Sequence, residues 1–346
     1  MLNQIQIINP LQISDWDEII LSHPDYSLFH TKGWVKTIQD TYHYEPQFLS
    51  IINDNSFDAI IPLMIVDSFL TGTRAISLPF SDYCEPLIRG GIHFNELFDF
   101  LLEYFKTKKI KHIELRGGQK HFNDISASTF DYLHKLNLTD GEENIFKRFS
   151  SNTKRNIKKA EREGISINIS SSKKVMEDFY QMNCITRKKH GLPPQPKKFF
   201  DNLYKYLLKQ GRGFIAIAKH QNIPIAGAVY FLVGEKAIYK FGASYLKYQN
   251  LRANNMVMWS AIKHCINEGY KDFCFGRTEP DNEGLRRFKL GWGTVEEVNN
   301  TYKYDLRVNS FIPIQTKTTG YHTKIFAKTP LPLLKLFGRM FYKHFG

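Results

Sequence analysis

The sequence predicts a mixed α/β fold in which one α/β unit occurs twice along the chain. Short apolar segments typical of strands alternate with segments whose apolar residues recur every three or four positions, as in helices. The two halves follow the same order of strand, helices, antiparallel strands, helix and strand. IKHIELRGG at 110–118 occupies the place in the first half that YKDFCFGRT at 270–278 occupies in the second. A duplication explains this order most economically.

The composition is that of a folded, aromatic-rich protein. Of its 346 residues, 42% are hydrophobic, 14% aromatic and 23% charged, which excludes disordered, collagen-like and simple coiled-coil chains. A sharp change to the polar, basic segment SSNTKRNIKKAEREG begins at Ser150. We therefore expect an N-terminal unit over residues 1–145, a C-terminal unit over 146–310 and a basic amphipathic tail over 311–346.

Alternation and cap residues define the elements of the first half. Residues 5–8 alternate like a strand, and Ser14 is the expected N-cap of a short helix that ends at Leu21. Apolar residues at helical spacing predict a core-facing helix over 94–105. The remaining predictions are a helix at 33–42 and strands at 47–52, 59–66, 73–78 and 112–115.

The second half reads in the same way. The capped basic segment 150–163 and the periodic segment 173–189 are predicted helices, and a proline-rich break at 192–196 separates the latter from a helix at 197–209. Turn residues at 221–222 and 234–235 separate three predicted strands, at 214–218, 225–233 and 237–241. The remaining predictions are strands at 165–169 and 272–275 and helices at 254–267 and 283–289.

Several classes of function lack a sequence signal. The longest apolar runs, 59–66 and 226–233, are far shorter than the roughly 18–20 residues of a membrane span, and the first residues lack the pattern of a secretory signal. The four cysteines and the dispersed histidines lack metal-ligand spacing. We therefore expect reduced, buried thiols in a cytoplasmic protein, with no metal site and no tightly bound cofactor. No Walker loop or dinucleotide fingerprint occurs.

The segment GRTEPDNEGLRRFKLGWG, residues 276–293, contains the densest set of candidate site residues. It follows a predicted strand, where α/β folds place ligands, and its glycines and proline indicate backbone bends. Arg277, Asn282, Arg286 and Lys289 can all bind an anion or donate hydrogen bonds. From composition alone, the alternative is an ordinary solvated surface helix.

Two further segments are candidates for substrate binding or proton transfer. In the basic helix, Lys154, Lys158 and Arg162 recur every four residues, beside a second row of Arg155 and Lys159. Such a face is suited to nucleotide, tRNA or lipid phosphates, and the alternative is a solvated helix. In the loop LPFSDYCEPL, Asp82 and Glu85 are candidate general bases for an amine, and the alternative is a solvated pair of carboxylates.

The end of the chain, LPLLKLFGRMFYKHFG, is amphipathic. Its apolar residues fall on one helical stripe, and Lys335, Arg339 and Lys343 recur every four residues on the other side. A basic helix of this kind suits an anionic membrane surface, here through residues 327–345. The alternative is that the tail docks on the protein's own body.

Five segments together resemble the FemAB-like branch of the GNAT acyltransferase superfamily, which includes peptidoglycan-bridge aminoacyltransferases. They are RNIKKAEREG, FYQMNCITRKKHGLPPQP, AGAVYFLVGEKAIYKFGAS, NNMVMWSAIKHCINEGYKDFCFGRT and NEGLRRFKLGWG, which span about 150–305. LFHTKGW and SLPFSDYCEPL extend the resemblance more weakly over 25–135. The resemblance implies two tandem GNAT-like units, each a mixed and mostly antiparallel sheet flanked by helices.

The resemblance also implies roles for residues. The Phe-Lys pair at the Fem reaction centre corresponds to Phe288 and Lys289, and Lys289 would stabilise the tetrahedral intermediate. The same comparison implies that Arg277 and Asn282 line this cleft. Arg187 and Lys189 correspond to the helix end that helps to hold the acceptor's phosphates.

The donor follows less directly from the resemblance. Ordinary GNAT enzymes carry Gln or Arg followed by xxGxG or xxGxA before the long helix, whereas this chain reads YQNLRANNMVMW. Asn254 and Asn255 still begin a helix able to take a phosphate. The coiled-coil arm that some bridge enzymes use for tRNA is absent. The donor therefore stays open between acyl-CoA and aminoacyl-tRNA.

The leading hypothesis is a transferase that forms an amide on an amine of a cell-envelope precursor, acting in the cytoplasm at the inner face of the membrane. Its partners would be a phosphate-bearing or lipid-linked substrate and, with an aminoacyl donor, tRNA. One alternative is an acyl-CoA-dependent N-acetyltransferase acting on a nucleotide-linked amino sugar. Another is a non-catalytic basic module that binds tRNA or anionic lipid, which the net charge of +13 would also explain.

Overall fold

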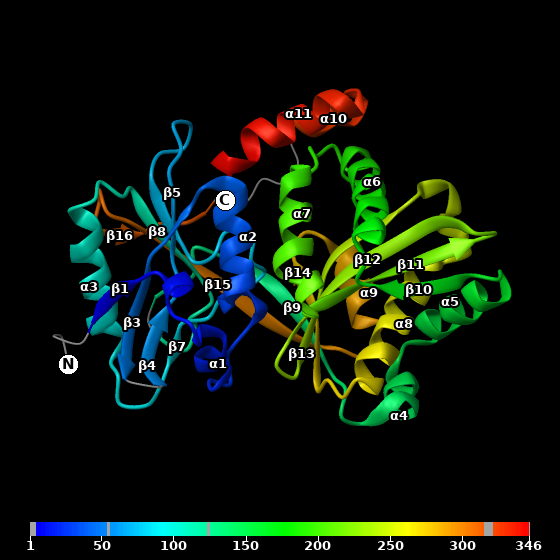
Figure 1. Cartoon of the computed structure of the whole chain (residues 1–346), viewed down its shortest axis with the longest axis horizontal. Helices are drawn as coiled ribbons and strands as arrows, with labels where there is room; N and C mark the ends of the chain where they lie inside the picture. The colour runs from blue at the N-terminus through cyan, green and yellow to red at the C-terminus, as the bar shows by residue number, and fades with distance from the viewer. Residues whose placement is uncertain (1–4, 54–55, 123–124, 315–320, 346) are drawn as a thin grey trace. The chain divides into compact units, whose positions relative to one another are not determined.

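The computed structural model describes residues 5–53, 56–122, 125–314 and 321–345, which form two compact units (Figure 1). Unit 1 comprises Met1–Asp131, Asn299–Lys317 and Phe341–Gly346, and unit 2 comprises Tyr132–Val298 and Thr318–Met340. The expected boundary after residue 145 falls inside unit 2, and the expected tail is divided between the units. A linear division differs from this result because strand β15 (Val295–Asp305) leads the chain back to unit 1.

The described residues of unit 1 form two groups of paired strands and three α-helices. Strands β1 (Gln6–Ile8), β3 (Phe48–Asn53), β4 (Ser56–Ile61) and β7 (Leu87–Ile88) form an antiparallel sheet in the order β1-β3-β4-β7. The second group pairs β2 (Glu45–Pro46), β5 (Met64–Val66), β6 (Arg74–Ile76), β8 (His112–Arg116), residues 301–305 of β15, and β16 (Ser310–Phe311). The helices are α1 (Trp16–Leu21), α2 (Lys32–Tyr42) and α3 (Phe94–Lys106), with 3₁₀ turns at Pro10–Gln12 and Leu28–His30.

The core of unit 1 forms beneath α3. Leu97, Leu101 and Phe105, which follow each other at helical spacing, are buried against Ile113 and Leu115 of β8. Side chains on alternate positions of a strand share a face, so one face of β8 supplies both of its core residues. The periodicity that predicted this helix therefore also identified its buried face.

Unit 2 is built on a six-stranded sheet in the order β10-β11-β12-β13-β14-β9. All neighbouring strands are antiparallel except β13 and β14, which run parallel. The strands are β9 (Thr129–Asn137), β10 (Ser166–Ser170), β11 (Gly213–His220), β12 (Ile223–Val233), β13 (Lys236–Ser244) and β14 (Asp272–Thr278).

Helices cover both faces of this sheet (Figure 1). Ala228 and Tyr230 of β12 join a core with Ile157 of α5 (Ser151–Arg162) and Ile262 of α8 (Ala253–Asn267). Gly227, on the opposite side of β12, faces Phe179 of α6 (Lys173–Lys189). The remaining helices are α4 (Gly141–Arg148), α7 (Lys197–Tyr206) and α9 (Glu283–Leu290), with 3₁₀ turns at Leu208–Gln210 and Leu246–Leu251.

The predicted duplication is visible in the topology. In unit 1, β6 and β8 are parallel neighbours and α3 lies between them in sequence. In unit 2, β13 and β14 are parallel neighbours and α8 lies between them. Parallel strands need a long crossover, which both units make with a helix. The predicted mixed α/β fold, mostly antiparallel and flanked by helices, is confirmed.

Some predicted boundaries are wrong. The expected strand over 59–66 is two strands, β4 and β5, separated by Pro62 and Leu63, because proline has no N–H to donate to a ladder. The first helix begins at Trp16, and its N-cap is Asp15 rather than Ser14. The helix expected over 197–209 ends at Tyr206 and continues as a 3₁₀ turn.

The tail is helical where the structure describes it. Helices α10 (Tyr321–Lys328) and α11 (Leu331–Phe341) are followed by a 3₁₀ turn at Tyr342–His344. Residues 315–320 of the expected tail lie outside the described residues. Within the described ranges, no helix is long and apolar enough to cross a membrane.

Candidate active site

Lys289 is a buried cation in unit 2. Its side chain is only 2% exposed, and its Nζ donates hydrogen bonds to the carbonyl oxygens of Gly276 and Arg277, both at 2.8 Å. Lys289 lies near the end of α9, which begins where the Asn282 side chain accepts a hydrogen bond from Leu285 N at 3.2 Å. A lysine is rarely this buried unless its ammonium is paired or hydrogen-bonded. The two carbonyl oxygens therefore fix the position of the Lys289 ammonium.

A β-bulge supplies the two carbonyls. The ladder between β14 and β9 changes register between Cys274 and Arg277, so two residues of β14 stand opposite one residue of β9. Gly276 has a φ of 69° in this bulge, a conformation that glycine adopts without steric cost. The bulge frees backbone acceptors at the strand end, where Lys289 uses them.

A buried polar network lies beside Lys289. His134 of β9 is fully buried, and its Nε2 lies 3.0 Å from Oε2 of Glu296. Arg286 donates to both Glu296 oxygens, at 2.7 and 2.6 Å, and its guanidinium lies 4.1 Å from the centre of the Tyr132 ring. Burial lowers the pKa of His134, and the positive charge of Lys289 lowers it further. His134 is therefore neutral near pH 7, with its proton on the nitrogen that faces Glu296.

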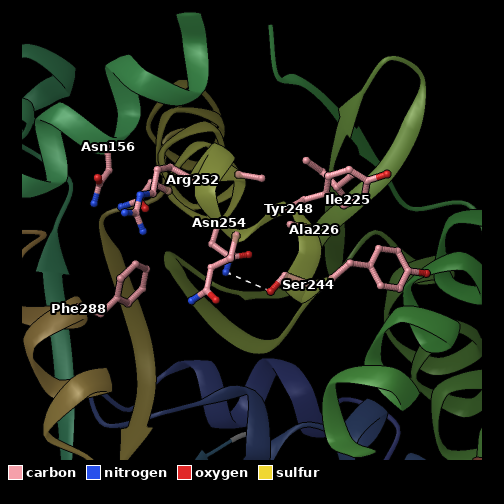
Figure 2. A pocket seen from close by; sticks show the side chains of 12 residues that line it. Asn156, Ile225, Ala226, Ser244, Tyr248, Arg252, Asn254 and Phe288 are labelled. Atoms are coloured by element: carbon pink, nitrogen blue, oxygen red, sulfur yellow. Dashed lines mark hydrogen bonds between the residues drawn. The ribbon is translucent and has the colours of Figure 1, made fainter. Parts of the chain in front are cut away.

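A pocket with a volume of about 190 Å³ opens where α8 begins (Figure 2). Phe288, the residue before Lys289, contributes its ring to one side, near Asn156 and Arg252 in the same view. Drug-sized ligands occupy roughly 300–1,000 Å³, so this hollow suits one group of a substrate. Its lining includes two tyrosines, Tyr245 and Tyr248, and the polar residues Asn156, Ser244, Gln249, Arg252, Asn254 and Asn255.

The start of α8 gives this pocket an electropositive character. The first amides of a helix have no partner within the helix, and its dipole places partial positive charge there. Asn255 is 7% exposed and lines the pocket, while Asn254 Nδ2 lies 3.4 Å from Ser244 Oγ. Arg252 precedes the helix with a φ of 59°, which is unusual for a residue other than glycine. In the acetyl-CoA signature, the first glycine comes three residues after a Gln or Arg. If Gln249 is taken as that first residue, Arg252 occupies the position of the glycine.

The structure brings only some of the predicted site residues into this pocket. Phe288, Asn254 and Asn255 line it, and Lys289 is the neighbour of Phe288. Arg277 is exposed and contributes its carbonyl to Lys289, whereas Asn282 caps α9, and neither lines the pocket.

The predicted phosphate-binding residues lie on helix surfaces. Arg155 and Lys158 are exposed on α5, where Arg155 donates to Asn152 Oδ1 at 2.7 Å. Lys189 is exposed at the end of α6, and the Nε of half-buried Arg187 lies 3.3 Å from the Pro193 carbonyl oxygen. Sequence reasoning missed the pocket residues Asn156, Ser244, Gln249 and Arg252. Asn156 is adjacent to the predicted basic residue Arg155, and the comparison of YQNLRANNMVMW with the acetyl-CoA signature was the sequence signal for Gln249 and Arg252.

Asp82 and Glu85 belong to unit 1. Asp82 is 8% exposed, and its carbonyl oxygen accepts a hydrogen bond from Asn299 Nδ2 at 3.3 Å. Glu85 Oε2 accepts from the Gly118 amide at 2.6 Å, and a Cβ on Gly117 would lie 2.6 Å from the other carboxylate oxygen. Glycine is therefore needed at Gly117, and the Glu85 carboxylate is engaged with the backbone.

The cysteines offer no nucleophile. All four, Cys84, Cys184, Cys265 and Cys274, are buried free thiols. Burial raises the pKa of Cys84 well above its ordinary value and raises that of Cys265 to about 12. A reactive cysteine needs a lowered thiol pKa and solvent access, so covalent catalysis by these two thiols is disfavoured. Among the described residues, no group of three His, Cys, Asp or Glu is arranged to hold a metal ion.

Comparison with known sequences identifies the domain that holds Lys289. Residues 147–303 match the acetyltransferase (GNAT) domain family. The chain is also similar to lipid II:glycine glycyltransferase of Staphylococcus haemolyticus, with 28% identity over 133 residues. That match covers 36% of this chain and 31% of the relative, so the chain spans about a third of that protein's length.

Solved structures share the fold over most of the chain. The crystal structure of FemX matches with a TM-score of 0.69 and 15% identity, over 87% of this chain and 97% of FemX. A tandem GNAT protein from the clavulanic acid biosynthesis pathway matches with a TM-score of 0.54 and 7% identity, over 87% and 98% of the two chains. At these identities the likeness concerns the fold. The chain therefore contains a domain of the acetyltransferase (GNAT) family at residues 147–303, and it shares its fold with FemX.

Proposed function

We propose that the protein is an N-acyltransferase that moves an acyl or aminoacyl group onto an amine of a cell-envelope precursor. The observation that carries the proposal is the buried ammonium of Lys289, fixed by two carbonyls next to pocket-lining Phe288. The similarity to a lipid II:glycine glycyltransferase supports the aminoacyl form of the reaction and the class of acceptor.

The chemistry requires stabilisation of negative charge and removal of a proton. The amine lone pair attacks the carbonyl carbon of an ester or thioester, and the carbonyl oxygen becomes an oxyanion. When this intermediate collapses, the C–N bond remains, the bond to the leaving oxygen or sulfur breaks, and the amine proton passes to a base. Lys289 stabilises the oxyanion in this proposal, because a positive charge held in a low-dielectric site favours the transition state over the ground state.

The pocket at the start of α8 is the proposed donor site. Arg252 and the first amides of α8 bind a phosphate of the donor there, and Asn254 and Asn255 supply hydrogen bonds. Both acyl-CoA and aminoacyl-tRNA carry such phosphates. We favour aminoacyl-tRNA, because the acetyl-CoA signature is missing from the sequence and the relative is a glycyltransferase.

The acceptor's phosphates are assigned to three exposed cations and one half-buried cation, Arg187, on α5 and α6. Arg155, Lys158, Arg187 and Lys189 are the residues proposed for this role. The proton of the attacking amine is assigned to a phosphate of the substrate, and Asp82 of unit 1 stays a candidate base from the sequence. Glu85 is the weaker candidate because its carboxylate already accepts a backbone hydrogen bond.

The test is transfer of labelled glycine from glycyl-tRNA, or of a labelled acetyl group from acetyl-CoA, to purified lipid II or a UDP-linked amino sugar. Lys289→Met should lower single-turnover transfer about 100- to 1000-fold and leave donor affinity little changed. Arg287→Met, which removes an exposed cation from the same helix, is the matched control and should transfer normally.

Folding must be monitored in this test. Methionine cannot donate to the Gly276 and Arg277 carbonyls, and an unsatisfied buried polar group costs about 1–3 kcal/mol. Transfer is therefore compared at a temperature where circular dichroism reports both variants folded. Undiminished transfer by folded Lys289→Met would reject the role of Lys289. Tight donor binding without transfer from either donor would favour a non-catalytic binding module.

A further inference from the structure

Exposed apolar side chains concentrate at the end of the chain. On α11, Leu333, Leu336 and Met340 are 49%, 50% and 52% exposed, and Phe337 is 40% exposed. Their spacing of three, four and seven residues places them on one side of the helix. We call Leu333, Leu336, Phe337 and Met340 the tail face.

The tail face is distinct from the side by which α11 is docked. Leu334 is fully buried, and Gly338 lies so close to the Pro194 carbonyl that a Cβ would clash with it. Lys335 Nζ lies 3.1 Å from Gln181 Oε1 and 5.5 Å from the centre of the Tyr180 ring. The stripe expected from the sequence is therefore split, with one side packed on unit 2 and the tail face exposed.

The charges around the tail face have one sign. No Asp or Glu follows Asp305 in the sequence, whereas Lys324, Lys328, Arg339 and Lys343 are all exposed. A helix that pairs an exposed apolar stripe with cations suits the boundary between the headgroups and acyl chains of an anionic bilayer. A partner protein would need both a complementary groove and a negative surface.

A second apolar feature adjoins the end of the tail within unit 1. Phe69 and Leu70, between β5 and β6, are 83% and 51% exposed, and Phe345 is 65% exposed. The Phe69 and His344 rings meet edge to face with centroids 4.5 Å apart, and Ser68 Oγ lies 2.9 Å from His344 Nδ1. These contacts hold an exposed aromatic residue beside the last turn, where interfacial anchors are common.

We propose that the tail face binds the surface of an anionic lipid bilayer. Phe69, Leu70 and Phe345 give unit 1 an exposed apolar feature of the same kind. The apolar side chains enter the headgroup region, and Lys324, Lys328, Arg339 and Lys343 contact lipid phosphates. This inference goes beyond the proposed transfer reaction, since it assigns a second surface with its own ligand. A bilayer surface is also where a lipid-linked acceptor would be found.

The test is co-sedimentation of the full chain with vesicles of phosphatidylcholine alone and with 30% phosphatidylglycerol. The wild-type chain should bind the anionic vesicles at least about tenfold more tightly, and 0.5 M NaCl should remove most of this preference. The triple variant Leu333→Gln, Leu336→Gln, Met340→Gln should lose about tenfold or more in affinity. Lys328→Gln combined with Arg339→Gln should reduce the preference for anionic vesicles.

The matched control removes apolar residues of equal exposure elsewhere. Ile223 and Leu246 are 50% and 58% exposed, and the double variant Ile223→Gln, Leu246→Gln should bind vesicles like the wild type. Equal binding by the tail-face variant and this control would overturn the proposal, as would wild-type protein that ignores anionic vesicles. A dimer in sedimentation velocity that only the tail-face variant abolishes would reassign the surface to a second copy. Transfer to a water-soluble acceptor tests the proposed function separately.

Discussion

At the scale of single residues, Glu296 joins two groups of the site in unit 2. Its carboxylate accepts hydrogen bonds from Arg286 and lies within hydrogen-bond distance of His134, whose ring is buried beside Lys289. The hydrogen bond from Arg286 lowers the pKa of Glu296, so the carboxylate is charged near neutral pH. The charge fixes the orientation of Arg286 and the tautomer of His134 together.

Glu296→Gln should therefore destabilise the protein by about 1–2 kcal/mol, because a neutral amide oxygen replaces a carboxylate that accepts a bidentate, charge-assisted pair. Glu297→Gln is the matched control on the same strand. Glu297 pairs with Lys135 at 2.6 Å, but both side chains are almost half exposed, and such pairs contribute between 0 and about 1 kcal/mol. Urea unfolding curves measure both changes, and equal losses would show that the network adds nothing.

The site illustrates what a sequence can and cannot predict about a residue. The α9 sequence EGLRRFKL has the charge pattern of a surface helix, and Arg287 is indeed exposed. Lys289 is buried because the carbonyls of the bulge accept hydrogen bonds from its ammonium. The amino-acid sequence does not show which backbone carbonyls are available as acceptors. Composition placed Lys289 among four candidate residues, and the family resemblance, through the Phe288-Lys289 pair, singled out this lysine.

At the scale of elements, the position of Lys289 depends on the bulge in β14. Gly276 adopts a φ of 69° there, and the carbonyls of Gly276 and Arg277 accept the lysine's hydrogen bonds. A side chain at this conformation costs roughly 1–2 kcal/mol through contact between its Cβ and the backbone. The bulge is therefore the element whose geometry the candidate site needs most.

Two glycine-to-alanine changes distinguish the need for a positive φ at Gly276 from a general effect of replacing glycine. Gly276→Ala should lower the free energy of unfolding by about 1–2 kcal/mol, because alanine is strained at positive φ. Gly284→Ala, in α9, should raise it by up to about 1 kcal/mol, because a Cβ there meets open space and alanine favours the helix. Thermal and urea unfolding of the two variants provide the measurement. A stabilised Gly276→Ala would contradict the strain argument.

Long amphipathic elements were the most predictable ones. The predicted helix over 173–189 coincides with α6, and the spacing over 94–105 correctly predicted α3. Strand β15 was not predicted, because VEEVNNTYKYD is polar and does not alternate cleanly. Its pairing partner β8 lies far away in sequence, and tertiary pairing of this kind overrides local propensity.

At the scale of the whole molecule, the polypeptide leaves unit 1 and returns to it. β15 leads the chain back to unit 1, and the last turn is fixed there by Tyr44 Oη and Arg74 Nη2, which donate to the carbonyls of Lys343 and His344 at 2.8 Å each. The two units are thus not consecutive segments. A boundary inferred from a change in composition identifies where unit 2's basic helix begins and misses this return.

Buried and partly buried histidines should make the protein sensitive to mild acid. Burial lowers the pKa of His23, His121, His134 and His344, and it lowers that of His112 to about 4. An unfolded histidine binds a proton below its ordinary pKa of about 6.5, whereas these folded ones do so only at lower pH. Between those values the unfolded state binds more protons, so the free energy of unfolding decreases as pH falls.

His112 allows the sharpest test of this linkage. Burial and the charges of Lys303 and Arg74 keep it neutral against the opposing effect of Glu114 and Asp305, so its contribution declines from about pH 6.5 to about pH 4. The wild type should lose stability between pH 7.5 and 5, and His112→Gln should lose measurably less over the same interval. That interval lies above the ordinary carboxylate pKa values of about 4, which keeps Asp305, whose pKa is about 2, out of the comparison.

His93→Gln controls for removal of an exposed histidine. Urea midpoints at four pH values suffice, and parallel pH profiles for the wild type and His112→Gln would show that His112 does not contribute to the acid sensitivity.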